Sequence, residues 1–281
     1  MFPPPNSCDC HVHVIGPKGR FPLPANRRYT PSDATATELA TMLKRLGMTR
    51  VVIIQPSFYG TDNACTLDGM AQVGNARGVA VLPAQVPAAE LDSLHKQGIR
   101  GIRINIATVG GAPLDEIRDK VNAAAKLAER HGWHVQLFIA AEVIEPIAPL
   151  LRTLPVDSVI DHFGLIAPGT TAGPLRALQG LLESGKTWVK ISGAYRIDSD
   201  PNNRQIDLLA RVLCKANSER IVWGSDWPHT PPHTIQKPLD QESPFQNIET
   251  LGLRDLLPRW LEDGALIARV LVSNPAKLYD F

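Results

Sequence analysis

Short hydrophobic runs alternate with amphipathic segments along almost the whole chain. The runs are rich in valine and isoleucine, which is typical of buried parallel strands. They cover residues 9–14, 50–56, 79–86, 101–106, 134–139, 158–164, 187–193 and 220–228. Between them lie patterns with helical period, such as residues 35–47, 114–132 and 202–216. Gly47 and Gly132 stand where the first two of these helices are expected to end.

Eight strand segments separated by helices predict a (β/α)₈ barrel. The chain has 281 residues, and one such barrel typically needs about 250. No Gly-x-Gly-x-x-Gly pattern follows a strand, which disfavours an open dinucleotide-binding sheet. We therefore expect a single α/β domain over residues 1–281, a TIM barrel whose chemistry lies at the carboxyl ends of its strands.

Composition and charge exclude several classes of protein. The net charge is +1, from 29 Lys and Arg against 28 Asp and Glu, and no basic tract suggests a nucleic-acid partner. No apolar run approaches the roughly 18 residues of a membrane span, and "MFPPPNS" lacks a secretion signal, so we expect a cytoplasmic protein. Four scattered cysteines are too few for a disulfide framework, and we expect thiols at Cys8, Cys10, Cys65 and Cys214. Cys8 and Cys10 could suggest a soft metal site beside His11, but we expect them as small core residues of the first strand.

Four polar side chains fall near the expected strand ends. His11 and His13 lie two residues apart in "DCHVHV" and would share one face of the first strand. His162 lies on the sixth predicted strand in "DHFG", and Asp226 lies on the eighth in "GSDWPH". Each alone has a structural explanation, a hydrogen-bonded histidine or a turn aspartate. Their convergence on one barrel mouth predicts an active site.

A second set of polar residues would surround this mouth. Ser57 follows the second strand, Arg103 and Asn105 lie on the fourth, and Tyr195 and Arg196 follow the seventh. A buried ion pair, a turn or a rim position would explain each one separately. The planar guanidinium groups of the two arginines match carboxylates, which indicates an anionic ligand.

These motifs carry a family resemblance. "DCHVHV", "DHFG" and "GSDWPH" resemble the amidohydrolase superfamily, in its amidohydrolase-related branch. The strings "RRYTPSDA", "VIIQPSFYGTDN", "GIRGIRINI" and "SGAYRI" are similar to the 2-pyrone-4,6-dicarboxylate lactonase group, which includes sulfomuconolactone hydrolases and galactarolactone isomerases. The resemblance extends from about residue 8 to residue 279.

The resemblance raises the question of a metal. In the superfamily a first-strand His-x-His and a last-strand Asp usually bind zinc, helped by a histidine or a carboxylated lysine from the middle strands. This chain departs from that pattern at its fifth strand, where "HVQLFIA" offers Gln136 and Phe138, while His134 lies at the opposite end. The lactonase group works without a metal, so we expect no cofactor. A divalent ion such as zinc, held by His11, His13 and Asp226, is the alternative.

The resemblance also implies a mechanism. Asp226 would activate water, while His11, His13 and His162 would donate hydrogen bonds to a lactone carbonyl. The anionic substrate would be held by six residues: Arg103, Arg196, Ser57, Tyr29, Tyr195 and Asn105. The dicarboxylate lactonase has one more arginine after its fourth strand, where this chain has Val109 between small residues. A lactone with one acidic group, or a sugar-acid lactone, therefore fits better than the pyrone dicarboxylate.

Three other functions remain open at this point. The same residues could isomerise a sugar-acid lactone, a bound metal would favour an amidohydrolase or decarboxylase, and a barrel without turnover could bind a small anion. We expect a monomer or homodimer with a small anionic lactone as its partner. The loops 15–35 and 228–247 would carry most of the specificity.

Overall fold

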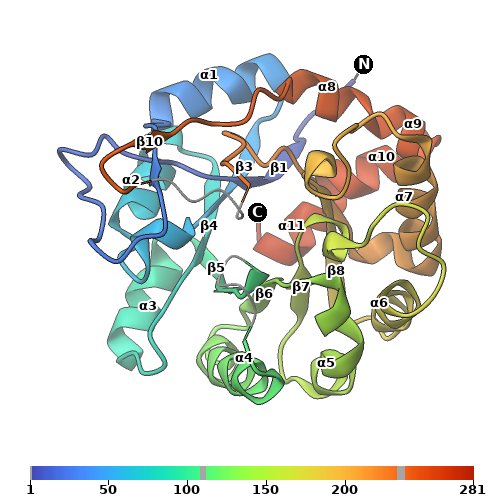
Figure 1. The fold of residues 1–281 in the computed structure, drawn as a ribbon, viewed down its shortest axis with the longest axis horizontal. Coiled ribbons are helices and arrows are strands. Elements are labelled where there is room, and N and C mark those ends of the chain that lie inside the picture. The colour runs from blue at the N-terminus through green and yellow to red at the C-terminus, as the bar shows by residue number, and fades with distance from the viewer. Residues whose placement is uncertain (1, 108–111, 233–237) are drawn as a thin grey trace.

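Eight parallel strands form one continuous sheet that curves into a barrel with the helices outside it (Figure 1). The computed structural model describes residues 2–107, 112–232 and 238–281. The strands follow chain order, apart from a separate two-stranded pair, β2 (Thr30–Pro31) with β10 (Glu242–Ser243). The barrel strands are β1 (Cys8–Val12), β3 (Arg50–Ile54), β4 (Ala76–Ala80), β5 (Ile99–Asn105), β6 (His134–Phe138), β7 (Ser158–Ile160), β8 (Thr187–Ser192) and β9 (Ile221–Gly224). The predicted TIM barrel is confirmed.

The helices follow the strands as the sequence pattern predicts. Those along the barrel wall are α1 (Ala36–Leu46), α2 (Ala64–Val73), α3 (Ala88–Lys96), α4 (Leu114–Glu129), α5 (Ala141–Thr153), α6 (Pro174–Glu183) and α7 (Arg204–Asn217). Thr35 and Glu38 form a capping box at the start of α1, and Gly47 ends it in the left-handed conformation. Gly132 has a positive φ in the turn after α4.

The third barrel strand, β4, differs from its prediction. The sequence predicts strand residues 79–86, whereas β4 covers Ala76–Ala80. Pro83 and Pro87 cannot donate hydrogen bonds to a neighbouring strand, and the chain leaves the sheet before them. Gly78 lies inside β4 because a Cβ atom there would meet Met70 Sδ at 2.5 Å and Ile99 Cδ1 at 2.6 Å. Packing of α2 against the sheet therefore outweighs the low strand preference of this glycine.

The barrel closes between β1 and the chain that follows β9. Asp226 N donates to His11 O at 2.8 Å, and His13 N donates to Trp227 O at 2.9 Å. Buried Asp9 strengthens the closure, since its Oδ1 accepts hydrogen bonds from Ser225 N at 2.9 Å and His11 N at 3.2 Å. The last bonds of the barrel are therefore made by the segments that carry the candidate active-site residues.

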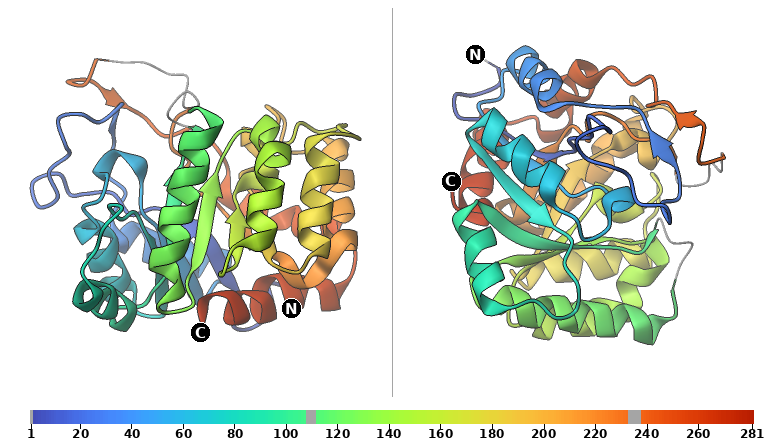
Figure 2. Two further views of the ribbon diagram at one scale, coloured as in Figure 1. Left: turned by 90° about the horizontal axis from the view of Figure 1, so that it is seen from below. Right: turned by 90° about the vertical axis from the view of Figure 1, so that its left-hand side faces the viewer.

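The two ends of the barrel are covered differently. The C-terminal helices α8 (Thr250–Asp255), α9 (Leu257–Leu261), α10 (Gly264–Ala268) and α11 (Asn274–Tyr279) continue from the last loop. Figure 2 shows the last of them, in red, at the end opposite the long loops of residues 15–35 and 238–249. All four cysteines are buried and free. In the described part of the chain, no helix is both long and apolar enough to cross a membrane.

Gly224 tests how tightly this closure is packed. A Cβ atom added there would lie 2.5 Å from His11 Cβ and 2.7 Å from His11 N. Because backbone atoms cannot move away freely, we expect Gly224→Ala to lower the free energy of unfolding by about 2 kcal/mol, measured by urea denaturation. Gly252→Ala is the control, since its nearest contact would be an ordinary 3.8 Å. Equal stability of the two variants would contradict the close packing.

Candidate active site

The candidate site begins where three barrel strands end. His11 lies on β1, and His13 follows it by two residues. His162 begins the short 3₁₀ helix His162–Leu165 after β7, and Asp226 lies two residues beyond β9. Asp226 and His162 have φ values of 63° and 50°, a left-handed conformation that is uncommon outside glycine and often found at functional sites. These backbone turns occur where both side chains reach the barrel mouth.

Three imidazole rings surround one carboxylate oxygen. Asp226 Oδ1 lies 3.7 Å from His11 Nε2, 3.8 Å from His13 Nε2 and 3.9 Å from His162 Nε2. All four residues are buried. Neither Asp226 Oδ1 nor His11 Nε2 has a hydrogen-bond partner within the described residues. The structure thus brings together the four residues that the sequence predicts as catalytic, around polar atoms that can bind a ligand.

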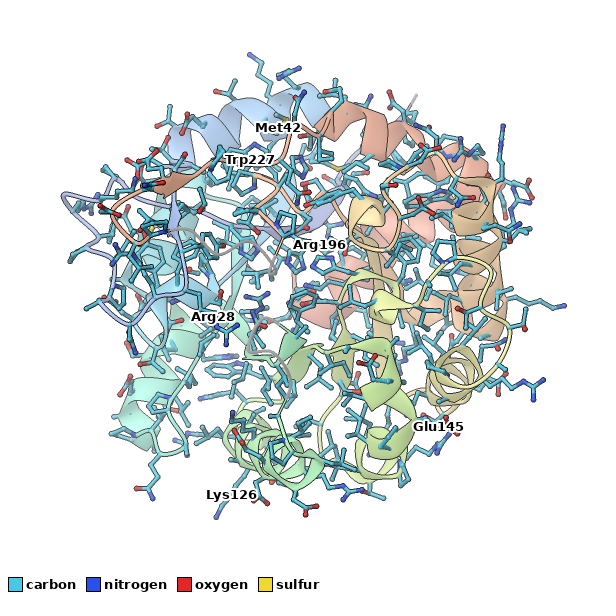
Figure 3. All side chains as sticks on the ribbon, in the orientation of Figure 1. Arg28, Met42, Lys126, Glu145, Arg196 and Trp227 are labelled. Atoms are coloured by element: carbon cyan, nitrogen blue, oxygen red, sulfur yellow. The ribbon has the colours of Figure 1, made fainter. Side chains whose placement is uncertain are left out.

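The other oxygen of Asp226 is fully engaged. Tyr195 Oη donates to Oδ2 at 2.6 Å, and Arg196 Nε donates to the same oxygen. Burial would raise the pKa of Asp226, but nearby positive charge, above all the Arg196 guanidinium, outweighs it and holds that pKa well below its usual range. Asp226 is therefore an oriented, ionised carboxylate with one free oxygen. In Figure 3, Arg196 lies near the centre of the strand ring.

A hydrogen-bonded chain supports Tyr195 from behind. Its Oη lies 3.3 Å from His229 Nδ1, and His229 Nε2 lies 2.8 Å from Thr250 Oγ1. Burial lowers the pKa of His229 to about 4, so this ring is neutral. Tyr195 and Arg196, predicted to contact the substrate, thus contact Asp226 directly and fix its orientation.

The histidines of the site are neutral near pH 7, but the ring nitrogen that carries the hydrogen differs between them. Burial lowers the pKa of His13 to about 3 and that of His162 to about 4. His13 Nδ1 lies 2.7 Å from Ile54 O, and because a carbonyl only accepts, this nitrogen carries the hydrogen. Neutral His13 therefore presents a lone pair on Nε2. It can accept a hydrogen bond there, whereas the predicted donation to a carbonyl would require protonation.

His162 has a more adaptable partner. Its Nδ1 lies 2.9 Å from Ser192 Oγ, a hydroxyl that can donate or accept. When Ser192 donates, the ring carries its hydrogen on Nε2 and presents a donor beside Asp226. His162 can thus donate a hydrogen bond from Nε2 to a carbonyl, which neutral His13 cannot do.

A buried polar cluster lies directly behind His11. Lys190 Nζ donates to Gln136 Oε1 at 2.8 Å and to Cys10 O at 3.0 Å. Gln136 Nε2 donates to Asp161 Oδ2 at 3.0 Å. Gln136, which stands where the superfamily would have a metal ligand, thus uses both ends of its amide within this cluster.

The spacing of two groups permits a metal ion, His11 with His13 and Asp226, and His11 with Asp161 and His162. A histidine that binds metal normally donates its other ring N–H to a carbonyl or carboxylate. His13 meets this condition through Ile54 O. At His11 two groups compete for this position: Asp161 Oδ1, which could accept, lies 3.3 Å from Nδ1, and the ammonium group of Lys190, which can only donate, lies at 3.4 Å. The donor set therefore fits a metal at His13 and Asp226, whereas its fit at His11 depends on which ring nitrogen carries the hydrogen.

Two neighbouring cavities lie beside these residues. The inner one, of about 20 Å³, is large enough for a single water molecule and is lined by His13, His162, Arg103 and Asp226 among others. The outer one has about 280 Å³. Three predicted substrate-binding residues line both: Tyr29, Ser57 and Asn105. These three residues separate the outer cavity from the inner one that Asp226 lines.

Arg103 is a buried cation at the inner cavity. Its Nη1 donates to Gln55 O at 2.9 Å, and its Nε has no hydrogen-bond partner. Among the residues that the structure describes, no carboxylate forms an ion pair with it. Val109, where a further arginine was considered, lies outside those residues.

The residues that sequence reasoning missed lie behind the predicted ones. Asp9 and Asp161 occur inside the quoted motifs, and His229 follows Asp226 in "GSDWPH", so their positions were visible but their contacts were not. Lys190 lies in "TWVKISG", where a charged residue inside a buried strand was the only signal. Lysine is almost never fully buried unless it is paired, which marks this residue as functional or structural.

Comparisons with known proteins find relatives that match almost the whole chain. An amidohydrolase family model matches residues 8–281. A 2-pyrone-4,6-dicarboxylate hydrolase of Comamonas testosteroni is 31% identical, over 98% of this chain and 90% of its own length. A D-galactarolactone isomerase of Agrobacterium fabrum is 30% identical, over 98% and 91%.

A solved structure shows the same fold. It is a probable 2-pyrone-4,6-dicarboxylic acid hydrolase from Acinetobacter baumannii with citric acid bound, 26% identical to this chain. The two align with a TM-score of 0.82 over 98% of this chain and 100% of the other. From the family match over nearly the whole length and the shared barrel, the chain belongs to the amidohydrolase family.

Proposed function

We propose that the protein hydrolyses a small lactone that carries an acidic group, without a metal. The observation that carries this proposal is Asp226, an ionised buried carboxylate that lines a cavity the size of one water. One of its oxygens is held by Tyr195, and the other has no partner among the described residues. Similarity to lactone hydrolases and to a lactone isomerase over almost the full chain supports this choice of substrate class.

Asp226 acts as the general base. A water molecule in the inner cavity donates to Asp226 Oδ1 and loses that proton as its oxygen bonds to the lactone carbonyl carbon. The ring C–O bond then breaks, and the departing alkoxide takes the proton back from Asp226. Tyr195 and Arg196 hold the other carboxylate oxygen, so Oδ1 stays aligned throughout.

Two histidines stabilise the negative charge that develops on the carbonyl oxygen. His162 donates from Nε2 when Ser192 donates to its Nδ1, and His11 donates from its own Nε2. His13, with its lone pair toward the cavity, accepts a hydrogen bond from the attacking water. The three rings thus have two different roles, although the sequence suggests a single one.

Arg103 supplies the preference for an acid. A buried guanidinium without a carboxylate partner among the described residues favours an anion beside it. Tyr29, Ser57 and Asn105 line both cavities and would contact the rest of the substrate. Arg196 is already paired with Asp226, so it contributes less to substrate binding than the sequence suggests.

Sugar-acid lactone isomerisation is the second candidate, favoured by the similarity to the galactarolactone isomerase. The same base would then deprotonate a substrate hydroxyl in place of water. Turnover in ¹⁸O-labelled water separates the two reactions. Hydrolysis places one labelled oxygen in the product carboxylate, whereas isomerisation places none.

Replacing the base tests the proposed role of Asp226. We expect Asp226→Asn to lower kcat on acidic lactones by about a thousandfold, since an amide cannot accept the proton, with little change in affinity for the hydrolysed product. Steady-state assays and calorimetry measure the two quantities. Asp119→Asn, on the exposed face of α4, is the control. Wild-type activity in Asp226→Asn would rule out the base, and binding without turnover in the wild-type protein would indicate an anion-binding barrel.

Replacing Arg103 tests the preference for acids. We expect Arg103→Met to raise KM for an acidic lactone by about ten- to a hundredfold, because a charge-assisted hydrogen bond is lost. KM for the corresponding methyl ester should hardly change. Arg100→Met is matched to it, since Arg100 lies on the same strand but pairs with Asp280. An equal rise for acid and ester would remove Arg103 from substrate recognition.

A further inference from the structure

Lys190 is a fully buried cation that the proposed reaction does not use. It extends from β8 toward the barrel axis, below the candidate active site. Two of its hydrogens go to Gln136 Oε1 and Cys10 O, at 2.8 and 3.0 Å. The third hydrogen of the ammonium group can point toward His11 Nδ1, which lies 3.4 Å from Nζ. Asp161 Oδ1 lies 3.5 Å from the same Nζ.

His11 lies between two buried carboxylates. Asp161 Oδ1 is 3.3 Å from its Nδ1, and Asp226 Oδ1 is 3.7 Å from its Nε2. A neutral imidazole has one hydrogen, so it can serve only one of them. Burial keeps this ring neutral by lowering its pKa well below the usual range. The groups around His11 therefore determine whether its hydrogen is on Nδ1 or on Nε2.

We propose that Lys190 determines the tautomer of His11 and holds its hydrogen on Nε2. An ammonium group has no lone pair, so its contact with Nδ1 requires that nitrogen to be the acceptor. Asp161 Oδ1 accepts no hydrogen bond in this arrangement, consistent with an Nδ1 that has no hydrogen to give. Lys190 Nζ also lies 3.5 Å from Asp161 Oδ1, and its positive charge weakens the attraction of that oxygen for the hydrogen of His11.

The consequence is a different use for each first-strand histidine. His13 is backed by a carbonyl and directs a lone pair toward the inner cavity, whereas His11 is backed by an ammonium group and directs a hydrogen toward Asp226 Oδ1. Lys190 is thus a positioning residue that makes His11 a donor and opposes metal binding there. The tautomer of His11 does not depend on the proposed function. Only the donation of its hydrogen to the lactone carbonyl rests on that function.

The tautomers can be read directly in the wild-type protein. Nitrogen-15 NMR of the histidine rings, with His11 assigned through His11→Gln, distinguishes protonated from unprotonated ring nitrogens. We expect His11 to be protonated on Nε2 alone and His13 on Nδ1 alone. The opposite state of His13 serves as an internal control. A hydrogen on His11 Nδ1 in the wild-type protein would overturn the proposal, and this measurement needs no variant of Lys190.

Removing the ammonium group should move the hydrogen of His11 from Nε2 to Nδ1. Lys190→Met leaves Asp161 behind His11, the arrangement that zinc-binding histidines have. We expect His11 Nδ1 to gain a hydrogen and the affinity for Zn²⁺, titrated by calorimetry, to rise by about ten- to a hundredfold. Lys215→Met, on the exposed side of α7, should change neither.

Neither readout involves turnover, so a failure of the proposed lactone hydrolysis would leave this test intact. A folded Lys190→Met protein with the His11 tautomer and zinc affinity of the wild type would reject the role of Lys190. If the unpaired Asp161 prevents folding, the wild-type spectrum decides by itself.

Discussion

Closure of the barrel between β1 and the segment after β9 determines where His11, His13 and Asp226 lie relative to one another. Two backbone hydrogen bonds, His11 O to Asp226 N and His13 N to Trp227 O, hold these segments side by side. Because they carry the histidine pair and the carboxylate, the bonds that complete the fold also assemble the site. Gly224 allows the close approach of the two strands, and Asp9 ties both together.

The electrostatics of the site follow from burying charges that must be balanced locally. Asp226 is matched by Arg196 and Asp161 by Lys190, while the three histidines are kept neutral by burial. Neutral rings cannot supply charge, so their effect depends on which nitrogen carries the hydrogen. A backbone carbonyl contacts Nδ1 of His13, a serine hydroxyl that of His162 and the lysine ammonium that of His11. These different partners determine which rings can donate a hydrogen bond from Nε2 and which can accept one.

Much of this arrangement could be predicted from the sequence, because strand periodicity and strand-end polar residues are local signals. His11, His13, His162 and Asp226 were found in this way. The partners of long side chains were not, since an arginine at a strand end can reach substrate or carboxylate equally well. Arg196 proved to hold Asp226, and Gln136 proved to support Lys190 and Asp161.

The errors in the fold have the same origin in tertiary contacts. Residues 79–86 have the stronger strand pattern, yet β4 lies earlier because Gly78 is needed under α2. Lys190 could not be placed, since every residue of β8 is buried and alternation carries no information there.

The most direct test of metal-free hydrolysis by Asp226 is metal content measured together with activity. Protein purified without added metal would be analysed for elements, and its turnover of acidic lactones compared before and after chelation. The account predicts metal well below one equivalent and turnover that resists the chelator. One tightly bound zinc per chain, with activity lost on chelation and restored by zinc, would contradict it and make His11, His13 and Asp226 ligands.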